Sequence, residues 1–166
     1  MAHTEPSDKK TTATLTIDGK QVTVPVGATI LEAATELGIR IPTLCWLKKV
    51  STTGACRICV VKVEGVERFM TACNTPVKEG INVTTRSENL TAIRTKIMEL
   101  MLVNHPLDCP VCDRGGECEL QELTFDWGNL EERFIEQKNA KAEKYLSPMV
   151  ARAPSRLWAG PIEPRP

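Results

Sequence analysis

The strongest constraint on this chain is a short segment, residues 105–118, that carries one histidine and three cysteines. It reads His-Pro-Leu-Asp-Cys-Pro-Val-Cys-Asp-Arg-Gly-Gly-Glu-Cys, so the ligand-type residues follow the spacing H-x3-C-x2-C-x5-C. Imidazole nitrogens and thiolate sulfurs bind zinc and iron–sulfur clusters, and four such groups can complete one site. We therefore expect the fold to gather these four side chains: His105, Cys109, Cys112 and Cys118.

The remaining four cysteines form a second set upstream, with the spacing C-x10-C-x2-C-x13-C. Four thiolates with a central C-x2-C suit a [2Fe–2S] cluster, in which each of the two irons takes two protein sulfurs. The small pair Gly54-Ala55 would let backbone amides approach such a cluster. The residues of this set are Cys45, Cys56, Cys59 and Cys73.

Spacing alone leaves other interpretations of both sets open. A four-cysteine zinc site shares the C-x2-C element, and buried unreactive cysteines are a further alternative for the upstream set. For residues 105–118, a zinc ion held by three thiolates and one imidazole is the natural alternative. A zinc-stabilised interaction module without redox function is thus a second class of protein that fits the cysteines.

The composition limits the cellular compartment and the kinds of binding partner that are expected for this chain. The chain has an odd number of cysteines, 7, and its first ten residues contain no apolar run, which argues against a secreted, disulfide-bonded protein. Lys plus Arg and Asp plus Glu both number 21, so a general nucleic-acid or anionic-membrane surface is not expected. We find no run of ~18 apolar residues that could span a membrane, so membrane association would come only through partner subunits.

The pattern before residue 87 predicts a β-grasp fold, in which a mixed sheet is crossed by one helix. Apolar and polar residues alternate over 14–24 around Asp18-Gly19, which indicates a hairpin. Thr29 and Glu32 form a capping box for a helix over about 30–37, with Gly38 at its end. Further strands are expected in three segments: 57–65, 67–73 and 81–85.

After residue 86 the composition changes and predicts a small helical domain. Ser87 can cap a helix that starts near Glu88 and ends by Asn104, because the following His-Pro pair disfavours helix. A second, short helix is expected over 117–125. The apolar face of the first helix should contain Leu90, Ile93, Ile97, Leu100 and Met101.

The α+β chain thus divides into four parts. A disordered arm is expected over 1–11, a [2Fe–2S] ferredoxin-type domain over 12–86 and a [4Fe–4S]-binding domain over 87–128. A tail without an independent fold should occupy 129–166.

Residues 104–121 closely resemble a module of the large electron-input subunit of respiratory complex I, the NADH:quinone oxidoreductase. Residues 54–59, with Cys45 and Cys73 around them, resemble the [2Fe–2S] domain that precedes that module in the family. The same module occurs in NAD-linked hydrogenases and formate dehydrogenases, which gives an alternative within redox chemistry. The resemblance covers roughly residues 13–128, in the same order along the chain.

The resemblance implies that the upstream cysteines hold a [2Fe–2S] cluster and that His105, Cys109, Cys112 and Cys118 hold a [4Fe–4S] cluster. It implies electron transfer from NADH, through a flavin-bearing partner subunit, along the clusters toward quinone. It also implies a multi-subunit oxidoreductase at the cytoplasmic, inner face of the plasma membrane. The isolated chain should have no dehydrogenase activity, since it lacks a G-x-G-x-x-G fingerprint and an evident flavin site.

The chain departs from the family after residue 118, because no further cysteine follows. Family members usually continue with more cluster-binding cysteines. A naturally short subunit, a fragment and a reading frame lost near residue 156 are the three explanations that stay open. The departure concerns the onward electron route and leaves both ligand sets unaffected.

Overall fold

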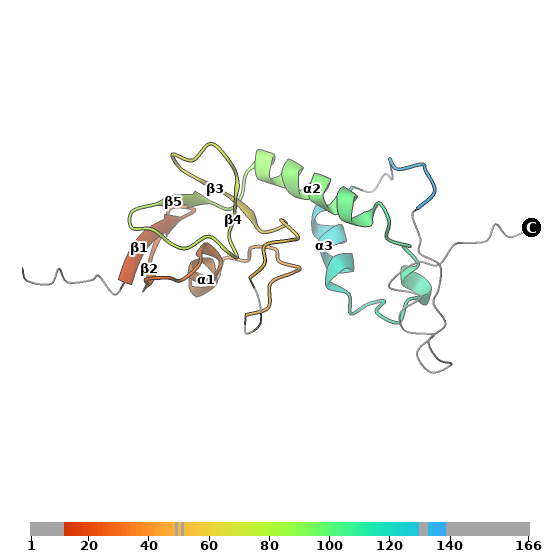
Figure 1. Cartoon of the computed structure of the whole chain (residues 1–166), viewed down its shortest axis with the longest axis horizontal. Helices are drawn as coiled ribbons and strands as arrows, with labels where there is room; N and C mark the ends of the chain where they lie inside the picture. Colours follow the sequence, from red (N-terminus) through yellow and green to blue (C-terminus); the bar gives the residue numbers. More distant parts are fainter. Residues whose placement is uncertain (1–11, 49, 51, 130–132, 139–166) are drawn as a thin grey trace, which may run out of the picture. The chain divides into compact units, whose positions relative to one another are not determined.

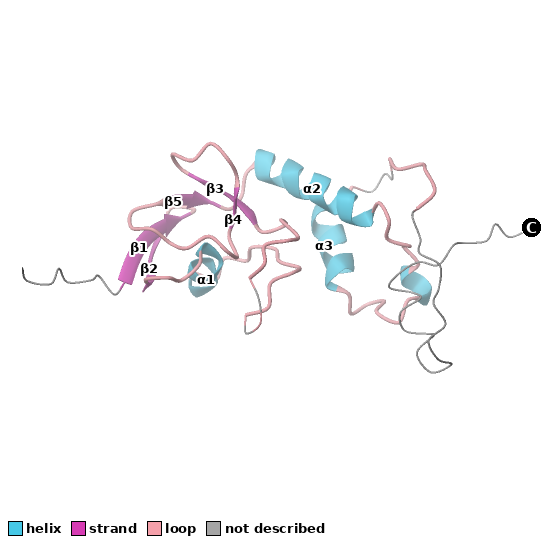
Figure 2. Ribbon diagram, in the orientation of Figure 1, coloured by secondary structure: helices cyan, strands magenta, loops and turns pink. Residues whose placement is uncertain are grey.

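The structure is a computed structural model that describes residues 12–48, 50, 52–129 and 133–138 (Figure 1). The chain forms two compact units, Met1–Thr91 and Ala92–Pro166. The first contains the strands and one helix, whereas the second contains most of a long helix, a 3-10 turn and a shorter helix (Figure 2). The predicted arm over 1–11 and most of the predicted tail over 129–166 lie outside the described residues.

The first unit begins with the predicted hairpin. Strand β1 (Thr12–Ile17) pairs antiparallel with β2 (Lys20–Pro25), and Ile17 lies opposite Lys20. The two turn residues between them, Asp18 and Gly19, have φ angles of 48° and 81°. Two consecutive positive φ angles define a type I′ turn, whose twist matches that of the flanking strands. The prediction from the Asp-Gly pair is therefore confirmed.

The hairpin belongs to a mixed five-stranded sheet with the strand order β2-β1-β5-β3-β4. Strand β5 (Asn82–Thr84) runs parallel to β1, whereas β3 (Val60–Val63) is antiparallel to both β5 and β4 (Met70–Thr71). This is the predicted mixed sheet with one helix. Asp18 also joins the hairpin turn to the end of β5, because its carboxylate accepts hydrogen bonds from the backbone N–H (2.8 Å) and the hydroxyl of Thr85.

The strand predicted over 67–73 is much shorter than expected. Only Met70–Thr71 pair with β3, and the preceding residues form a turn. The ammonium group of Lys62 explains this difference, since it donates hydrogen bonds to the carbonyls of Val66 (2.5 Å) and Glu67 (2.8 Å). Carbonyls that bind a lysine within a turn do not extend the ladder between strands.

Helix α1 (Ile30–Glu36) starts at the predicted capping box. The Glu32 carboxylate accepts a hydrogen bond from the Thr29 N–H (2.8 Å), and the Glu32 N–H donates to the Thr29 hydroxyl (3.3 Å). The buried residues of α1 pack against the inward-facing residues of the sheet. The most deeply buried members of this aliphatic core are Leu15, Ile17, Ile30, Ala33, Ala34, Val61 and Ala72.

The long helix α2 (Glu88–Leu102) starts where Ser87 accepts a hydrogen bond from the Leu90 N–H (3.2 Å), as predicted. The predicted apolar face is wrong in part. Its buried positions are Leu90, Arg94 and Met98, whereas Leu100 is 74% exposed. An arginine occupies a buried position because its guanidinium lies over the Trp127 ring, 4.6 Å from the ring centroid.

Helix α3 (Glu119–Trp127) is the second predicted helix, shifted by two residues toward the C-terminus. Between α2 and α3, the chain forms a 3-10 turn over Cys109–Val111 and then a loop through Gly115 and Gly116. The segment that joins α2 to α3 therefore carries all four ligand-type residues of the second set.

Candidate metal centres

Cys45 and Cys56 of the upstream set form one pair in the first unit. The backbone N–H of Cys56 donates a hydrogen bond to the Cys45 Sγ atom, at 3.3 Å. Burial acts to raise the pKa of the Cys45 thiol. Hydrogen bonds with Cys56, Thr53 and Ala55 outweigh the effect of burial, so this pKa is lowered. Backbone donors that point at a sulfur stabilise a thiolate, which is the form that binds metal.

Cys59 and Cys73 form a second pair next to the first. Cys59 directly precedes β3 and Cys73 follows β4, and the Ala72 N–H donates to the Cys59 carbonyl at 3.0 Å. Both side chains are 1% exposed. Burial, a hydrogen bond with Cys59 and the charges of the other three cysteines raise the pKa of Cys73 to about 12. The mutual electrostatic effect places all four upstream cysteines in one neighbourhood.

The loop around Cys56 has an unusual backbone that supports this arrangement. Gly54 and Arg57 have φ angles of 63° and 61°, and the Arg57 guanidinium donates to the Gly54 carbonyl at 3.4 Å. A Cβ atom at Gly54 would lie 2.5 Å from Nδ2 of Asn74, so the two residues are in close contact. Asn74 in turn accepts a hydrogen bond from the Thr71 hydroxyl. The loop is thus fixed against the residue that follows Cys73.

The histidine of the second set lies just beyond the C-terminus of α2. Its N–H donates to the Leu102 carbonyl at 3.0 Å, and its own carbonyl accepts a hydrogen bond from the Lys138 ammonium group at 2.7 Å. Burial and the positive charge of Lys138 lower the pKa of the His105 imidazole, with Asp108 acting in the opposite direction. A neutral imidazole offers a ring nitrogen to a metal.

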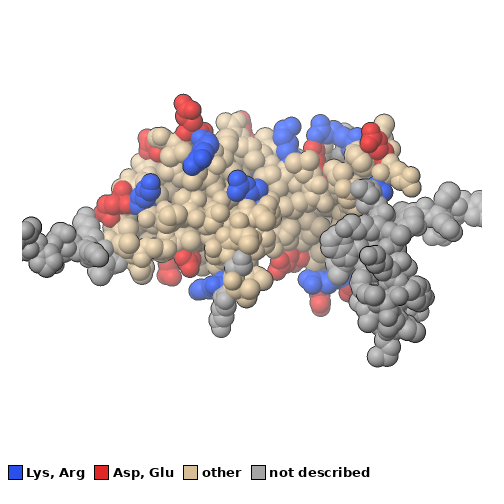
Figure 3. All heavy atoms as spheres, in the orientation of Figure 1, with Lys and Arg blue, Asp and Glu red and all other residues tan. Residues whose placement is uncertain are grey.

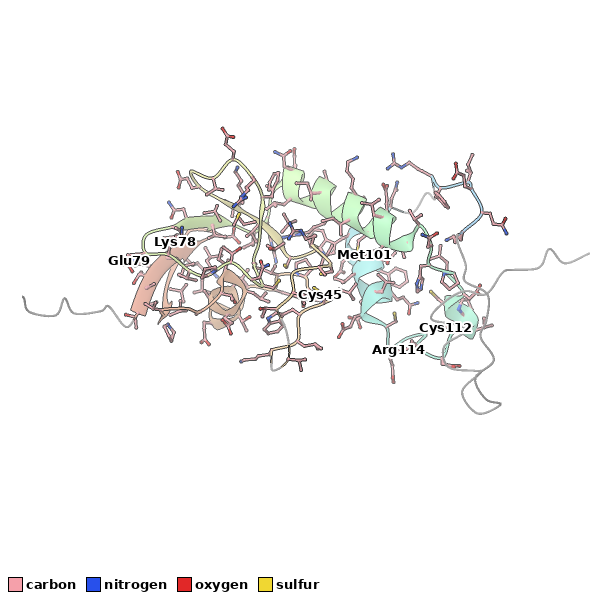
Figure 4. The ribbon with its side chains drawn as sticks, in the orientation of Figure 1. Cys45, Lys78, Glu79, Met101, Cys112 and Arg114 are labelled. Carbon is pink, nitrogen blue, oxygen red and sulfur yellow. The ribbon has the colours of Figure 1, made fainter. Side chains whose placement is uncertain are left out.

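The three cysteines of the second set occupy the turn and the helix start that follow. Cys109 begins the 3-10 turn, Cys112 ends it, and Cys118 is the N-cap residue of α3. All three are half-buried. Figure 4 labels Cys112 and Arg114 in this loop, and it labels Cys45 of the other set in the first unit.

A glycine packs closely on the backbone of this cysteine turn. The Gly115 N–H donates to the Cys112 carbonyl at 2.9 Å, and a Cβ atom on Gly115 would lie 2.6 Å from the Cys109 carbonyl oxygen. Gly116, with a φ of 86°, donates its N–H to the Gln121 side chain at 3.0 Å. The glycine pair therefore allows the chain to turn tightly from Cys112 toward α3.

The donor chemistry of both sets fits iron–sulfur clusters, since thiolates with an occasional imidazole are their protein ligands. Within the described parts of the chain, no three His, Cys, Asp or Glu side chains converge as the ligands of a single metal ion. Sequence reasoning missed three supporting residues: Arg57, Asn74 and Lys138. Each acts through a contact with the backbone or with a glycine, and such contacts leave no motif in a sequence.

Two family descriptions match the chain, one for each ligand set. Residues 10–88 match a 2Fe-2S iron-sulfur cluster binding domain, and residues 94–133 match the NADH-ubiquinone oxidoreductase-G iron-sulfur binding region. The chain is thus an iron–sulfur protein. More particularly, residues 94–133 form an iron–sulfur binding region of the NADH-ubiquinone oxidoreductase-G type.

Individual relatives extend the comparison. The chain is 61% identical, over 142 residues, to the NADPH-Fe(3+) oxidoreductase subunit alpha of Geobacter sulfurreducens, covering 86% of this chain and 17% of that protein. It is 42% identical over 134 residues to the NADH-ubiquinone oxidoreductase 75 kDa subunit of Reclinomonas americana, covering 81% and 19%. The chain therefore spans less than a fifth of the length of these two curated relatives.

A solved structure shares the fold. It is the crystal structure of an NAD+-reducing [NiFe]-hydrogenase in the H2-reduced state, with a TM-score of 0.71 and 33% sequence identity. The similarity covers 78% of this chain and 54% of the hydrogenase chain.

None of the helices in the described residues is long and apolar enough to cross a membrane. On the face drawn in Figure 3, acidic and basic side chains of the described residues are interspersed.

Proposed function

We propose that this chain is the electron-transfer part of an NAD(P)H-dependent oxidoreductase and relays electrons through two clusters. A [2Fe–2S] cluster would be held by Cys45, Cys56, Cys59 and Cys73, and a [4Fe–4S] cluster by His105, Cys109, Cys112 and Cys118. When bound, such clusters accept and donate single electrons. The chain itself would hold them, shield them from water and set their potentials through nearby hydrogen bonds.

The observation that carries this proposal is the arrangement of the upstream cysteines in two pairs. The Cys56 N–H donates a hydrogen bond to the Cys45 Sγ atom, and Cys59 lies close enough to Cys73 to raise the pKa of its thiol. A [2Fe–2S] cluster takes two protein sulfurs at each iron, so one pair would serve each iron.

A flavin-bearing subunit that oxidises the nicotinamide nucleotide is the expected partner. The acceptor we propose is quinone, in line with the name of the NADH-ubiquinone oxidoreductase relative, and the complex would then lie at the inner face of the plasma membrane. The higher identity to the NADPH-Fe(3+) oxidoreductase subunit, 61% against 42%, favours a second candidate that uses NADPH and another acceptor. A hydrogenase-type complex is a third candidate, given the shared fold with an NAD+-reducing hydrogenase.

Anaerobic purification of the 166-residue chain, with iron and acid-labile sulfide analysis and EPR, tests the clusters. We expect about six irons and six sulfides per chain, the sum of the two clusters, and two distinct reduced signals. Zinc in place of iron, with no labile sulfide, would reject the proposal in favour of a zinc-stabilised module.

Co-purification of the protein from its native host tests which system it belongs to. The expected complex contains a flavoprotein subunit, and NADH and NADPH are compared as reductants of the clusters within it. Faster reduction by NADPH, together with turnover of Fe(3+) but not quinone, would select the second candidate. Reduction of the isolated chain by either nucleotide would contradict the need for a partner.

A further inference from the structure

The segment 133–138 lies along the C-terminal half of α2 in the second unit. Arg133 forms an ion pair with Glu99, and the Lys138 ammonium group donates hydrogen bonds to the carbonyls of His105 (2.7 Å) and Leu102 (3.4 Å). Lys138 therefore contacts the end of α2 from a position 33 residues beyond His105 in the sequence.

The end of α2 needs a donor of this kind. The last carbonyls of a helix have no partners within the helix, and a nearby cation stabilises them. The last turn of α2 contains no basic residue of its own. Lys138 supplies that positive charge from outside the helix, and the carbonyl of His105, the histidine of the second set, accepts one of its hydrogen bonds.

The backbone of His105 is consequently held on both sides. Its N–H donates to Leu102 inside the last turn of α2, and its C=O accepts from Lys138. Leu102 accepts from both His105 and Lys138, so the three residues form one small network. Groups that fix the position of a metal ligand affect metal binding strongly, even though they do not contact the metal themselves.

We propose that Lys138 is a positioning residue for His105: it fixes the peptide of His105 at the end of α2 so that the imidazole is held toward the second cluster. This inference rests on the proposed function, because it takes His105 as a cluster ligand. It adds a residue that lies outside the H-x3-C-x2-C-x5-C segment and that no spacing pattern reveals.

The test compares Lys138→Met, Lys138→Arg and the control Lys96→Met in the 166-residue chain. Lys96 lies on the exposed side of the same helix, so its replacement removes the same charge at a different place. The readout is the 14N coupling of imidazole in pulsed EPR of the reduced second cluster, with His105→Cys as the reference that lacks this nitrogen. We expect at least a threefold loss of the 14N-coupled fraction in Lys138→Met, recovery in Lys138→Arg and no change in Lys96→Met.

Two results would overturn the inference. One is a 14N-coupled fraction in Lys138→Met equal to that of the unmodified chain. The other is a lower total cluster content in Lys138→Met with the coupling of the remaining clusters unchanged, because that outcome indicates only a general role in stability. A different result, an unmodified chain with a [4Fe–4S] signal but no 14N coupling, would refute the proposed ligation by His105 itself.

A second measurement does not depend on the cluster. In the metal-free chain, hydrogen exchange of the His105 amide reports on the hydrogen bond to Leu102. We expect Lys138→Met to accelerate this exchange about tenfold, while exchange in the middle of α2, near Met98, stays unchanged. Equal acceleration along the whole helix would contradict a positioning role, as would no acceleration at His105.

Discussion

Replacement of Gly54 by alanine tests whether the loop before Cys56 depends on a glycine. Gly54 is buried although its neighbours Thr53 and Ala55 are exposed, and its φ of 63° lies in the left-handed region. Alanine in that region costs ~1–2 kcal/mol. The new Cβ would also lie 2.5 Å from Asn74, which would have to move away and release its hydrogen bond with Thr71.

The contact with Asn74 gives the prediction its magnitude. Loss of one hydrogen bond contributes about 1 kcal/mol, so Gly54→Ala should lower the free energy of unfolding of the first unit by ~2–3 kcal/mol. Gly65 is the matched control, because it has a similar φ of 75° but open space where a Cβ would lie. Gly65→Ala should therefore cost only the backbone contribution of ~1–2 kcal/mol.

Urea unfolding of the metal-free chain, followed through NMR signals of amides in β1 and β3, measures these changes. Asn74→Ala should cost about 1 kcal/mol on its own, and the double variant should be no less stable than Gly54→Ala alone. Fully additive effects would refute the argument, because they would mean that Gly54 and Asn74 act independently. Equal destabilisation by Gly54→Ala and Gly65→Ala would refute it as well.

Three further predictions concern the first unit. Asp18→Ala removes two hydrogen bonds to buried Thr85, so the free energy of unfolding should fall by about 1–2 kcal/mol in urea titrations; an unchanged midpoint would contradict this. Thr29→Ala breaks the capping box of α1 and should cost ~1 kcal/mol by the same assay, whereas Thr29→Ser should cost less. In the metal-free chain at pH 8, iodoacetamide should modify Cys45 before Cys73, because the lowered pKa of Cys45 gives more thiolate while a pKa of about 12 keeps Cys73 protonated. Equal modification rates of Cys45 and Cys73, measured by mass spectrometry, would contradict this order of reactivity.

Local signals in the sequence predicted much of the first unit. The Asp18-Gly19 turn and the capping box of Thr29 and Glu32 each involve residues at most three apart, so the sequence contains both partners. The same holds for Ser87, which caps α2. Short-range hydrogen bonds of this kind depend little on the rest of the fold, and the predicted hairpin and helix starts are confirmed.

Contacts between distant residues could not be predicted in this way. Arg94 occupies a buried position on α2 because Trp127, on another helix, receives its guanidinium. Periodicity treats an arginine as a surface residue, and so the predicted apolar face included exposed Leu100 instead. For the site, spacing identified the eight candidate ligands, but the grouping of the upstream cysteines into two pairs depends on how β3 and β4 are joined.

The two ligand sets differ in how much of the fold each needs. Cys59 and Cys73 meet only when β3 and β4 pair, so the first set requires the sheet to be formed, and these two cysteines are already buried. The second set lies on one short segment, with half-buried cysteines in a turn that Gly115 closes locally. Because the second segment has less support from the rest of the fold, we expect it to gain order when a metal or cluster binds. We therefore infer that long-range support matters most for the candidate ligand at the edge of the second segment, His105, and Lys138 contacts the chain there.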